Sequence, residues 1–496
     1  MNVADLLTTR ALAMPDAIAA IHGEISLTLA EMESAVWRMA HHLREFGLKP
    51  GDVAGLQVGD PLLHLIAAFA LARTGIVHLA VSNDPSAADP NADLLRRTGA
   101  VAMITDQTLA MEPPERRIRI DLETVLAGNG EADPALRSDG GNQPLMYKSS
   151  SGTTGRPKLI GATHAGMIAS IEREQTTVRY LPGEKYLTPV AMEFDAPKRR
   201  YIACVVSGST AVMPPSGRLI DSLLELIDRH DIRHFSCVPG QARTIANEVP
   251  PGRQRFPNMR CFRLSAAPSD GNLLDLLRER MCSGIVVSYG CSELGPMTFA
   301  GSESTARRPQ SVGRPMPGVT IEIRSAADES VPRGDTGIVR VRALGMPDAY
   351  VGDPEATARH FRNGWFYPGD LGALSLDGEL TLMGRADDMM IFDGINIAPK
   401  EIELVLQSYA GVREVAAFPL RSRRSHQMPA AAVVLDAGRD LDDLIRFAKS
   451  RLGSRAPILI IAVNQMPRNP GGKILKRTLS ELAENHLANS NRIDPS

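Results

Sequence analysis

The chain has 496 residues, which is too long for one hydrophobic core, because single cores stop growing near about 250 to 300 residues. With 43% apolar residues, 23% charged residues and a net charge of -2, its composition is that of a soluble globular protein, and it excludes long-range attraction to nucleic acid or to anionic membranes. The five cysteines are widely spaced without a CxxC pair, which argues against a disulfide framework or a zinc site and favours the cytoplasm.

The N-terminal segment and the longest apolar segment do not have the pattern of targeting or membrane segments. Asp5 and Arg10 interrupt the first apolar run, so we expect no signal peptide. The stretch "PLLHLIAAFALARTGIVHLAV" from Pro61 contains Arg73 and Gly75, whereas a membrane span needs about 18 apolar residues. It predicts a buried helix, a turn and a strand.

Short apolar runs alternate with helical patterns along the first half of the chain. Strands are predicted at "VAGLQV" from Val53, "IVHLAV" from Ile76 and "VAMIT" from Val101. The same alternation is predicted further along the chain, with helices at 219–229 and 272–281, each followed by an apolar strand. This alternation is typical of an α/β fold with doubly wound parallel sheets.

The sequence pattern changes in the last third of the chain. "VTIEIRSA" from Val319 and "TGIVRVRA" from Thr336 predict a small β-rich section. After the polar segment "GRADD" at 384–388 come an amphipathic helix near 400–408 and the strands "VREVAAFPL" and "AAAVVL". We therefore predict a large domain at 1–386 and a small α+β domain at 387–496.

The segment "SSSGTTGRPK" at 149–158 is suited to binding an anion. Its glycines allow close approach of backbone N–H groups, its hydroxyls add donors, and Lys158 adds charge. The Walker spacing GxxxxGK[ST] occurs neither here nor at Lys473, where Ile474 follows the lysine.

Seven motifs in order resemble those of the AMP-forming adenylating superfamily, which includes acyl- and aryl-CoA synthetases, peptide-synthetase adenylation domains and firefly luciferase. They are "SSSGTTGRPKLIGATH" (149–164), "LSAAP" (264–268), "SYGCSE" (288–293), "SVGRPMPG" (311–318), "GWFYPGDLG" (364–372), "GRADDMMIFDGINIAPKEIE" (384–403) and "MPRNPGGKILKR" (466–477). The resemblance implies a large ATP- and acid-binding domain followed by a small mobile domain that carries a catalytic lysine.

The resemblance also implies roles for individual residues in the nucleotide site. The phosphate loop would hold the β- and γ-phosphates of ATP through Ser151, Gly152, Thr153, Thr154, Gly155 and Lys158. Glu293 with Ser292 would organise Mg²⁺ and the α-phosphate, a role that suits one carboxylate beside phosphate oxygens. The remaining contacts to the nucleotide would come from Ala267, Pro268 and Tyr289, and from Asp370 at the ribose with Arg385 nearby.

The small domain would complete the chemistry. Lys473 would bridge the substrate carboxylate and the α-phosphate in the transition state, Asp387 would be the hinge, and Gly394 would lie along the thiol channel. Three positions depart from the family pattern, namely Leu159, Pro368 and Phe392, and they bear on fine contacts rather than on the reaction class.

The acid pocket is expected around "MEFDAPKRRYIACVVSGS" from Met192. If Pro197 lies in the first turn of a helix, Asp195 and Arg199 share one side of it. Asp195 could then meet a substrate ammonium group and Arg199 an anionic or polar group; alternatively Asp195 caps the helix and the cations 198–200 face solvent. The buried charges would disfavour a fatty acid, so a small polar, aromatic or amino acid is favoured.

The thiol acceptor stays open between CoA and a phosphopantetheinyl carrier protein supplied in trans, since the chain has no room for a fused carrier domain. Arg421, Arg423 and Arg424 are candidates for a contact with either acceptor, or are a solvated charge run. The sequence thus predicts an ATP-dependent, AMP-forming acid:thiol ligase that uses CoA. The alternatives are an amino-acid-activating enzyme that loads a carrier, a luciferase-like oxidase, and a non-catalytic nucleotide-binding relative.

Overall fold

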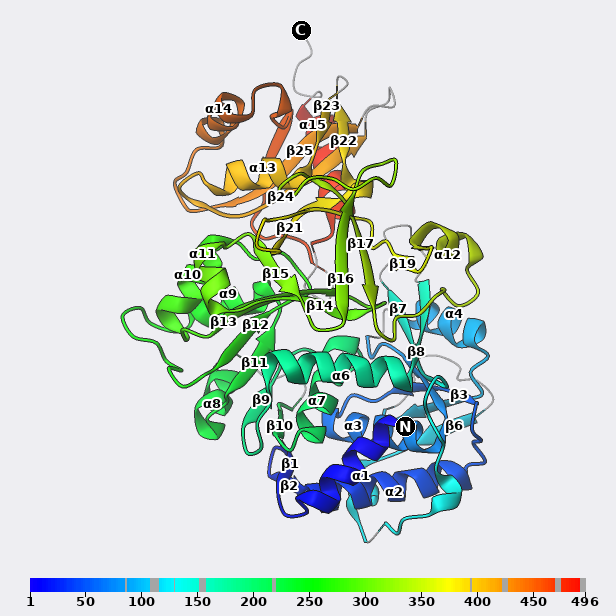
Figure 1. Ribbon diagram of the computed structural model, residues 1–496. Coiled ribbons are helices and arrows are strands. Elements are labelled where there is room, and N and C mark those ends of the chain that lie inside the picture. The colour runs from blue at the N-terminus through cyan, green and yellow to red at the C-terminus, as the bar shows by residue number, and fades with distance from the viewer. Residues whose placement is uncertain are drawn as a thin grey trace. The chain divides into compact units, whose positions relative to one another are not determined.

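The computed structural model describes residues 1–84, 87–107, 116–128, 130–150, 158–215, 220–392, 395–421, 427–468 and 474–490. The chain forms two compact units, the first made of 1–320 and 341–366 and the second of 321–340 and 367–496 (Figure 1). The predicted mixed α/β class, with a large N-terminal part and a small C-terminal part, is confirmed. The predicted domain boundary at 386/387, about which the C-terminal domain would move, stays a prediction.

The first unit contains a six-stranded sheet with the order β6-β5-β3-β4-β7-β8. Its pairings are parallel except for the last, which is the β7–β8 hairpin. The strands are β3 (Val53–Gln57), β4 (Val77–Ala80), β5 (Ala102–Thr105), β6 (Arg116–Arg119), β7 (Pro144–Ser150) and β8 (Lys158–Thr163). The predicted strands at Val53, Ile76 and Val101 are therefore confirmed.

A second sheet in this unit runs in the order β2-β1-β10-β9-β11-β12-β13-β14-β15. Its centre, from β1 to β13, is parallel, and β2, β14 and β15 add antiparallel edges. The strands are β1 (Ile18–His22), β2 (Ile25–Thr28), β9 (Lys185–Leu187), β10 (Thr210–Met213), β11 (His234–Cys237), β12 (Cys261–Leu264), β13 (Ile285–Cys291), β14 (Gly295–Ala300) and β15 (Ser311–Pro315).

Helices connect these strands, as the alternating pattern predicts. They are α1 (Val3–Ala13), α2 (Leu29–Glu45), α3 (Pro61–Thr74), α4 (Ala88–Thr98), α5 (Leu122–Leu126), α6 (His164–Val178), α7 (Asp195–Val206), α8 (Ile220–His230), α9 (Pro239–Asn247), α10 (Gly271–Arg280), α11 (Ser302–Arg307) and α12 (Pro354–His360). The predicted helices at 219–229 and 272–281 correspond to α8 and α10. Two short strands, β18 (Phe361–Arg362) and β19 (Trp365–Phe366), follow α12.

Helix α3 is the apolar segment that follows Asp60. The Asp60 carboxylate accepts a hydrogen bond from the Leu63 amide at 2.8 Å, Pro61 opens the first turn, and Gly75 ends the helix at φ 70°. Every residue from Leu62 to Thr74 is buried. Nowhere in the described residues does a helix reach the length and apolarity of a membrane span.

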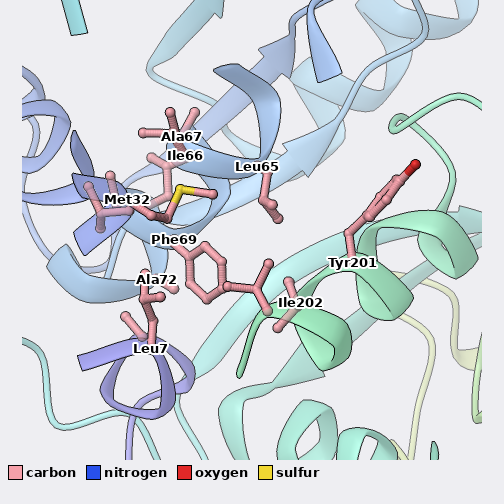
Figure 2. Close-up of a cluster of buried hydrophobic side chains, with 14 of the residues drawn as sticks. Leu7, Met32, Leu65, Ile66, Ala67, Phe69, Ala72, Tyr201 and Ile202 are labelled. Carbon is pink, nitrogen blue, oxygen red and sulfur yellow. The ribbon is translucent and has the colours of Figure 1, made fainter. Parts of the chain in front are cut away.

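The core around α3 also anchors α7. Phe69 points toward Ile202, with Leu65 and Tyr201 nearby, and Met32 packs on the other side (Figure 2). Burial of each such apolar side chain contributes roughly 1.5 to 3 kcal/mol to the free energy of folding. Helix α7 is therefore held on the N-terminal core by its C-terminal half.

The second unit contains antiparallel strands and a small three-layer body. Strands β16 (Val319–Arg324) and β17 (Gly337–Ala343) cross the unit boundary, and β17 pairs within this unit with β20 (Asp370–Leu374), which pairs with β21 (Leu380–Arg385). Next come β22 (Met390–Phe392) and β23 (Ile395–Ile397). The predicted β-rich section is thus present.

The body of the tail is a sheet of β24 (Val412–Arg421), β25 (Gln427–Leu435) and β26 (Leu459–Ala462). Ala417 and Ala431 face the cluster that contains α13 (Pro399–Gln407) and α14 (Leu441–Leu452). Phe418 and Ala430 face the cluster that contains α15 (Lys476–Ser490). Because successive side chains of a strand point to opposite faces, both faces of this sheet are buried. The predicted helix and strands of this domain are confirmed.

Candidate functional site

Part of the predicted site lies outside the described residues. These positions are Ser151, Gly152, Thr153, Thr154 and Gly155 of the phosphate loop, Gly394 and Lys473. Their roles stay predictions.

Lys158 is the first residue of β8 and lies beside Tyr350. Its Nζ is 5.1 Å from the centroid of the Tyr350 ring and 2.8 Å from Nε2 of His360, the last residue of α12. The Tyr350 hydroxyl donates a hydrogen bond of 2.8 Å to Oε1 of Glu293. Two predicted residues that are 135 positions apart, Lys158 and Glu293, therefore meet around one tyrosine. The sequence analysis did not select Tyr350, which no motif distinguishes.

Glu293 lies in the tight turn between β13 and β14. Cys291 is paired with Gly295 across this turn, and Gly295 has a φ of 72° that glycine adopts readily. The turn also places Ser292 beside Glu293, and Tyr289 lies on β13 opposite Thr298. Burial, and secondarily the charge of Glu293, raises the pKa of the Cys291 thiol. A carboxylate here is a hard oxygen donor of the kind that suits Mg²⁺.

The predicted adenine turn follows the carboxyl end of β12. Ala266 adopts φ 71°, a left-handed conformation that is unusual for alanine, and Ala267 and Pro268 come next. Arg200 of α7 donates from Nη2 to Oγ of Ser265 at 3.1 Å. Ligands of open α/β sheets bind at the carboxyl ends of parallel strands, which is where this turn lies.

In the second unit, Asp370, Arg385 and Asp387 form one cluster. Asp370 and Arg385 are register partners on β20 and β21, with Arg385 Nη1 3.3 Å from Asp370 Oδ1. Arg385 Nη2 is 3.6 Å from Asp387 Oδ2. Gly369 has φ 83°, and a Cβ there would lie 2.8 Å from Arg385 Nη2. The predicted ribose and hinge residues are therefore neighbours.

Asp195 is the first residue of α7, so the predicted helix is confirmed, and the N-cap position is held by Phe194 rather than by Asp195. It forms ion pairs with Lys148 of β7 at 3.1 Å and with Arg199. Burial opposes ionisation of Asp195, yet the charges of Lys148 and Arg199 outweigh it and lower its pKa to about 2. The sequence analysis missed Lys148, which stands in a strand without any charge pattern.

The cations that follow Asp195 are buried. Lys198 is 1% exposed, and Arg199 and Arg200 are each 4% exposed. The alternative that residues 198–200 face solvent is therefore wrong: Arg199 pairs with Asp195, and Arg200 contacts Glu174 of α6 and Ser236 of β11. Lys198 Nζ lies 3.0 Å from Nε2 of His78, and burial lowers the pKa of Lys198 to about 8.

A buried carboxylate on α6, Glu174, stabilises the other end of this cluster. It pairs with Arg263 of β12 at 2.8 Å and with Arg200 at 3.8 Å. Burial opposes its ionisation, but these two arginines lower its pKa to about 2. Helices α6 and α7 are neighbours (Figure 1), and the ion pair of Arg200 with Glu174 joins them.

Comparisons with known proteins place these features in context. The family model described as "AMP-binding enzyme" matches residues 7–351, and that described as "AMP-binding enzyme C-terminal domain" matches 401–473. A 2-succinylbenzoate–CoA ligase of Bacillus licheniformis is 26% identical over 493 residues, covering 97% of this chain and all of that protein. A feruloyl-CoA synthase of Amycolatopsis sp. is 28% identical over 481 residues, covering 94% and 96%.

A solved structure shares the fold. O-succinylbenzoate coenzyme A synthetase from Bacillus subtilis, in complex with ATP and magnesium ion, superposes with a TM-score of 0.83 at 23% identity, covering 96% of this chain and 98% of that one.

Proposed function

Since this chain belongs to the AMP-binding enzyme family and is an AMP-forming enzyme of the acyl-CoA synthetase type, we propose that it adenylates a small polar or aromatic carboxylic acid and transfers the acyl group to CoA. The observation that carries this proposal is the ordered match of both family models, at 7–351 and 401–473. The meeting of Lys158 and Glu293 around Tyr350 supports it.

The proposed reaction has two steps. The substrate carboxylate attacks the α-phosphate of ATP, so that a new C–O–P linkage forms and pyrophosphate leaves. The thiolate of CoA then attacks the acyl carbonyl, a thioester forms, and AMP leaves. Because phosphoryl transfer depends mainly on positioning and charge stabilisation, the protein needs donors and cations rather than a nucleophile of its own.

The described residues have defined tasks in the first step. Lys158 binds the β- and γ-phosphates together with the loop 151–155. Tyr350 holds the Glu293 carboxylate in one orientation through its 2.8 Å hydrogen bond. The hard oxygen donor of Glu293 fits Mg²⁺, which when bound would neutralise charge on the phosphate oxygens. Ala267, Pro268 and Tyr289 are proposed to contact the nucleoside from the ends of β12 and β13.

The second unit supplies the remaining tasks in this proposal. Asp370 accepts hydrogen bonds from the ribose hydroxyls while Arg385 orients it at 3.3 Å. Lys473 bridges the carboxylate and the α-phosphate as charge develops. Rotation of 387–496 about Asp387 then removes Lys473 and admits the thiol beside Gly394.

CoA is proposed as the acceptor rather than a carrier protein loaded with an amino acid. An amino-acid substrate would bring its ammonium group to Asp195, but Asp195 already pairs with Lys148 and Arg199. A third cation at one carboxylate would be repelled by the other two. We also propose a cytoplasmic location, which the five free cysteines support.

The test is acid-dependent pyrophosphate release from ATP, measured across amino, aryl, short-chain and dicarboxylic acids, first without thiol and then with CoA. We expect release with at least one non-amino acid, and AMP together with the matching acyl-CoA by mass spectrometry once CoA is added. Release with amino acids alone, and acyl transfer only to a carrier protein, would contradict the proposal in favour of the carrier-loading alternative.

A further inference from the structure

Six buried cationic side chains gather around α7, and they are called the α7 cation cluster here. Each is between 1% and 8% exposed, and they are Lys148, Arg173, Lys198, Arg199, Arg200 and Arg263. The carboxylates that face them are Glu174, Asp195 and Glu193. His64 and His78 add no charge, because burial and then Lys198 lower the pKa of each well below its usual value. In the described part of the chain, the cations of this cluster thus exceed the carboxylates by three, and buried charge without a partner is costly.

The excess is greatest at Arg173. Arg263 and Arg200 share Glu174, and Lys148 and Arg199 share Asp195. Arg173 has no carboxylate within ion-pair distance among the described residues; its terminal nitrogens donate to the carbonyls of Leu344 at 3.1 Å and Leu294 at 3.0 Å. Burial, and then the charge of Arg199, lowers the pKa of Arg173 to about 10.

Donor atoms of these arginines and of one serine are unsatisfied. Among the residues that the structure describes, Nε of Arg173, Nε of Arg199 and Oγ of Ser170 have no hydrogen-bond partner, although the three residues are 5%, 4% and 5% exposed. Buried polar groups without partners are rare in folded proteins, and each calls for an explanation, such as a bound ion or ligand.

The side chains that carry these donors meet at the turn that follows Glu293. A Cβ on Gly295 would lie 3.0 Å from Ser170 Oγ and 3.3 Å from Arg199 Nη1, and the carbonyl of Leu294 accepts from Arg173. Ser170 and Arg173 share one face of α6, three residues apart, and that helix packs on α7. The unsatisfied donors are therefore close to the proposed adenylation site.

We propose that the acid substrate carries a second anionic group, so that it is a dicarboxylic acid whose distal carboxylate binds Arg199, Arg173 and Ser170. This inference rests on the proposed function and names its substrate class. One carboxylate reacts with ATP while the other offsets the surplus positive charge, and Asp195 orients Arg199 through their ion pair.

The test compares matched acids that differ only at the distal group: adipate, its monoamide and hexanoate, and 3-(4-carboxyphenyl)propanoate against 3-phenylpropanoate. We expect kcat/KM for pyrophosphate release to be about 100-fold higher for a diacid than for its monoacid partner, because the monoacid leaves buried donors unpaired. Arg199→Met and Arg173→Met should each lower the ratio of the diacid to the monoacid kcat/KM by at least about tenfold. Arg173→Lys should retain most of it.

Calorimetric binding of the same acids without ATP gives a readout that does not depend on turnover. Diacids should bind the wild type more tightly than monoacids, and Arg199→Met should abolish the difference. Arg255→Met, at a surface ion pair with Asp228, is the matched control and should bind as the wild type does. Equal binding of diacids and monoacids would overturn the inference, even with an active enzyme. Absence of pyrophosphate release with every acid would instead overturn the proposed function, and calorimetry would still decide the inference.

Discussion

Tyr350 donates its hydroxyl hydrogen to Oε1 of Glu293 at 2.8 Å, and its ring lies beside the Nζ of Lys158. One aromatic side chain thus contacts both the proposed metal-binding carboxylate and the proposed phosphate-binding cation.

Replacing this tyrosine tests its positioning role. Tyr350→Phe keeps the ring beside Lys158 but removes the hydrogen bond to Glu293, which contributes about 1.5 to 3 kcal/mol when the acceptor is charged. We expect kcat/KM for pyrophosphate release to fall about tenfold or more and the Mg²⁺ concentration for half-maximal rate to rise. Tyr409→Phe, at a ring that packs on Phe447, is the control. A variant with unchanged Mg²⁺ dependence would remove Tyr350 from this role.

The two buried carboxylates predict how stability depends on pH. The pKa values of Asp195 and Glu174 are lowered from 3.8 and 4.5 to about 2, so the stability they contribute is present above about pH 4.5 and is lost as the pH falls toward 2. The shifts correspond to about 2 kcal/mol of stability for Asp195 and about 3 kcal/mol for Glu174. The urea midpoint should fall steeply from pH 4.5 to pH 2.5. Asp195→Asn should be less stable at pH 7, because it leaves Lys148 and Arg199 unpaired, and should show a shallower fall. Parallel pH curves for the variant and the wild type would contradict this assignment.

Gly369 and Gly378 offer a matched pair for the proposed ribose site. Both have positive φ, 83° and 82°, so alanine should cost each about 1 to 2 kcal/mol of stability. Only at Gly369 would the new Cβ meet Arg385, at 2.8 Å from Nη2, whereas Gly378 has nothing within 4 Å. We expect Gly369→Ala to raise the KM for ATP several-fold more than Gly378→Ala does, by displacing Arg385 from Asp370. Equal KM values in the two variants would separate Arg385 from nucleotide binding.

Lys473→Ala tests the division of labour between the two steps. Loss of its charge should abolish formation of acyl-AMP, while thiolysis of supplied acyl-AMP continues, because the second step breaks the acyl C–O bond without attack at phosphorus and, in the proposed cycle, proceeds after Lys473 has left the site. Lys476→Ala, which breaks a 3.2 Å ion pair with Asp388, controls for general effects on the tail. Equal loss of both half-reactions in Lys473→Ala would show that the lysine acts elsewhere.

Asp387→Pro tests the hinge. Proline restricts the backbone at the proposed pivot, so adenylation should persist while acyl transfer to CoA falls strongly. Single-turnover assays of the two half-reactions measure this directly. A variant that completes both at wild-type rates would place the pivot at another residue.

Local patterns were sufficient to predict much of the fold. Helix α3 begins after the N-cap Asp60 with Pro61 in its first turn, and it ends at Gly75. The apolar runs at Val53 and Val101 form strands. The reaction class could be predicted because its motifs occur in order along the chain.

Contacts between distant segments could not be predicted in this way. Lys148 meets Asp195 only because β7 lies beside α7, and Tyr350 meets Glu293 across 57 positions. A run such as Lys198 to Arg200 is usually a solvated face, and only the packing of α6 against α7 shows that here it is buried.

The anchoring of α7 has a consequence for redesign of the enzyme. The Tyr201 hydroxyl donates to the carbonyls of Val212 at 3.0 Å and Thr188 at 3.3 Å, and Ile202 packs on Phe69 (Figure 2). The residues that fasten this helix are therefore distinct from Asp195 and Arg199, which are proposed to face the acid. A library that varies 195 and 199 together, and keeps 201 and 202 fixed, would search new acid selectivities while the scaffold beneath them retains its shape.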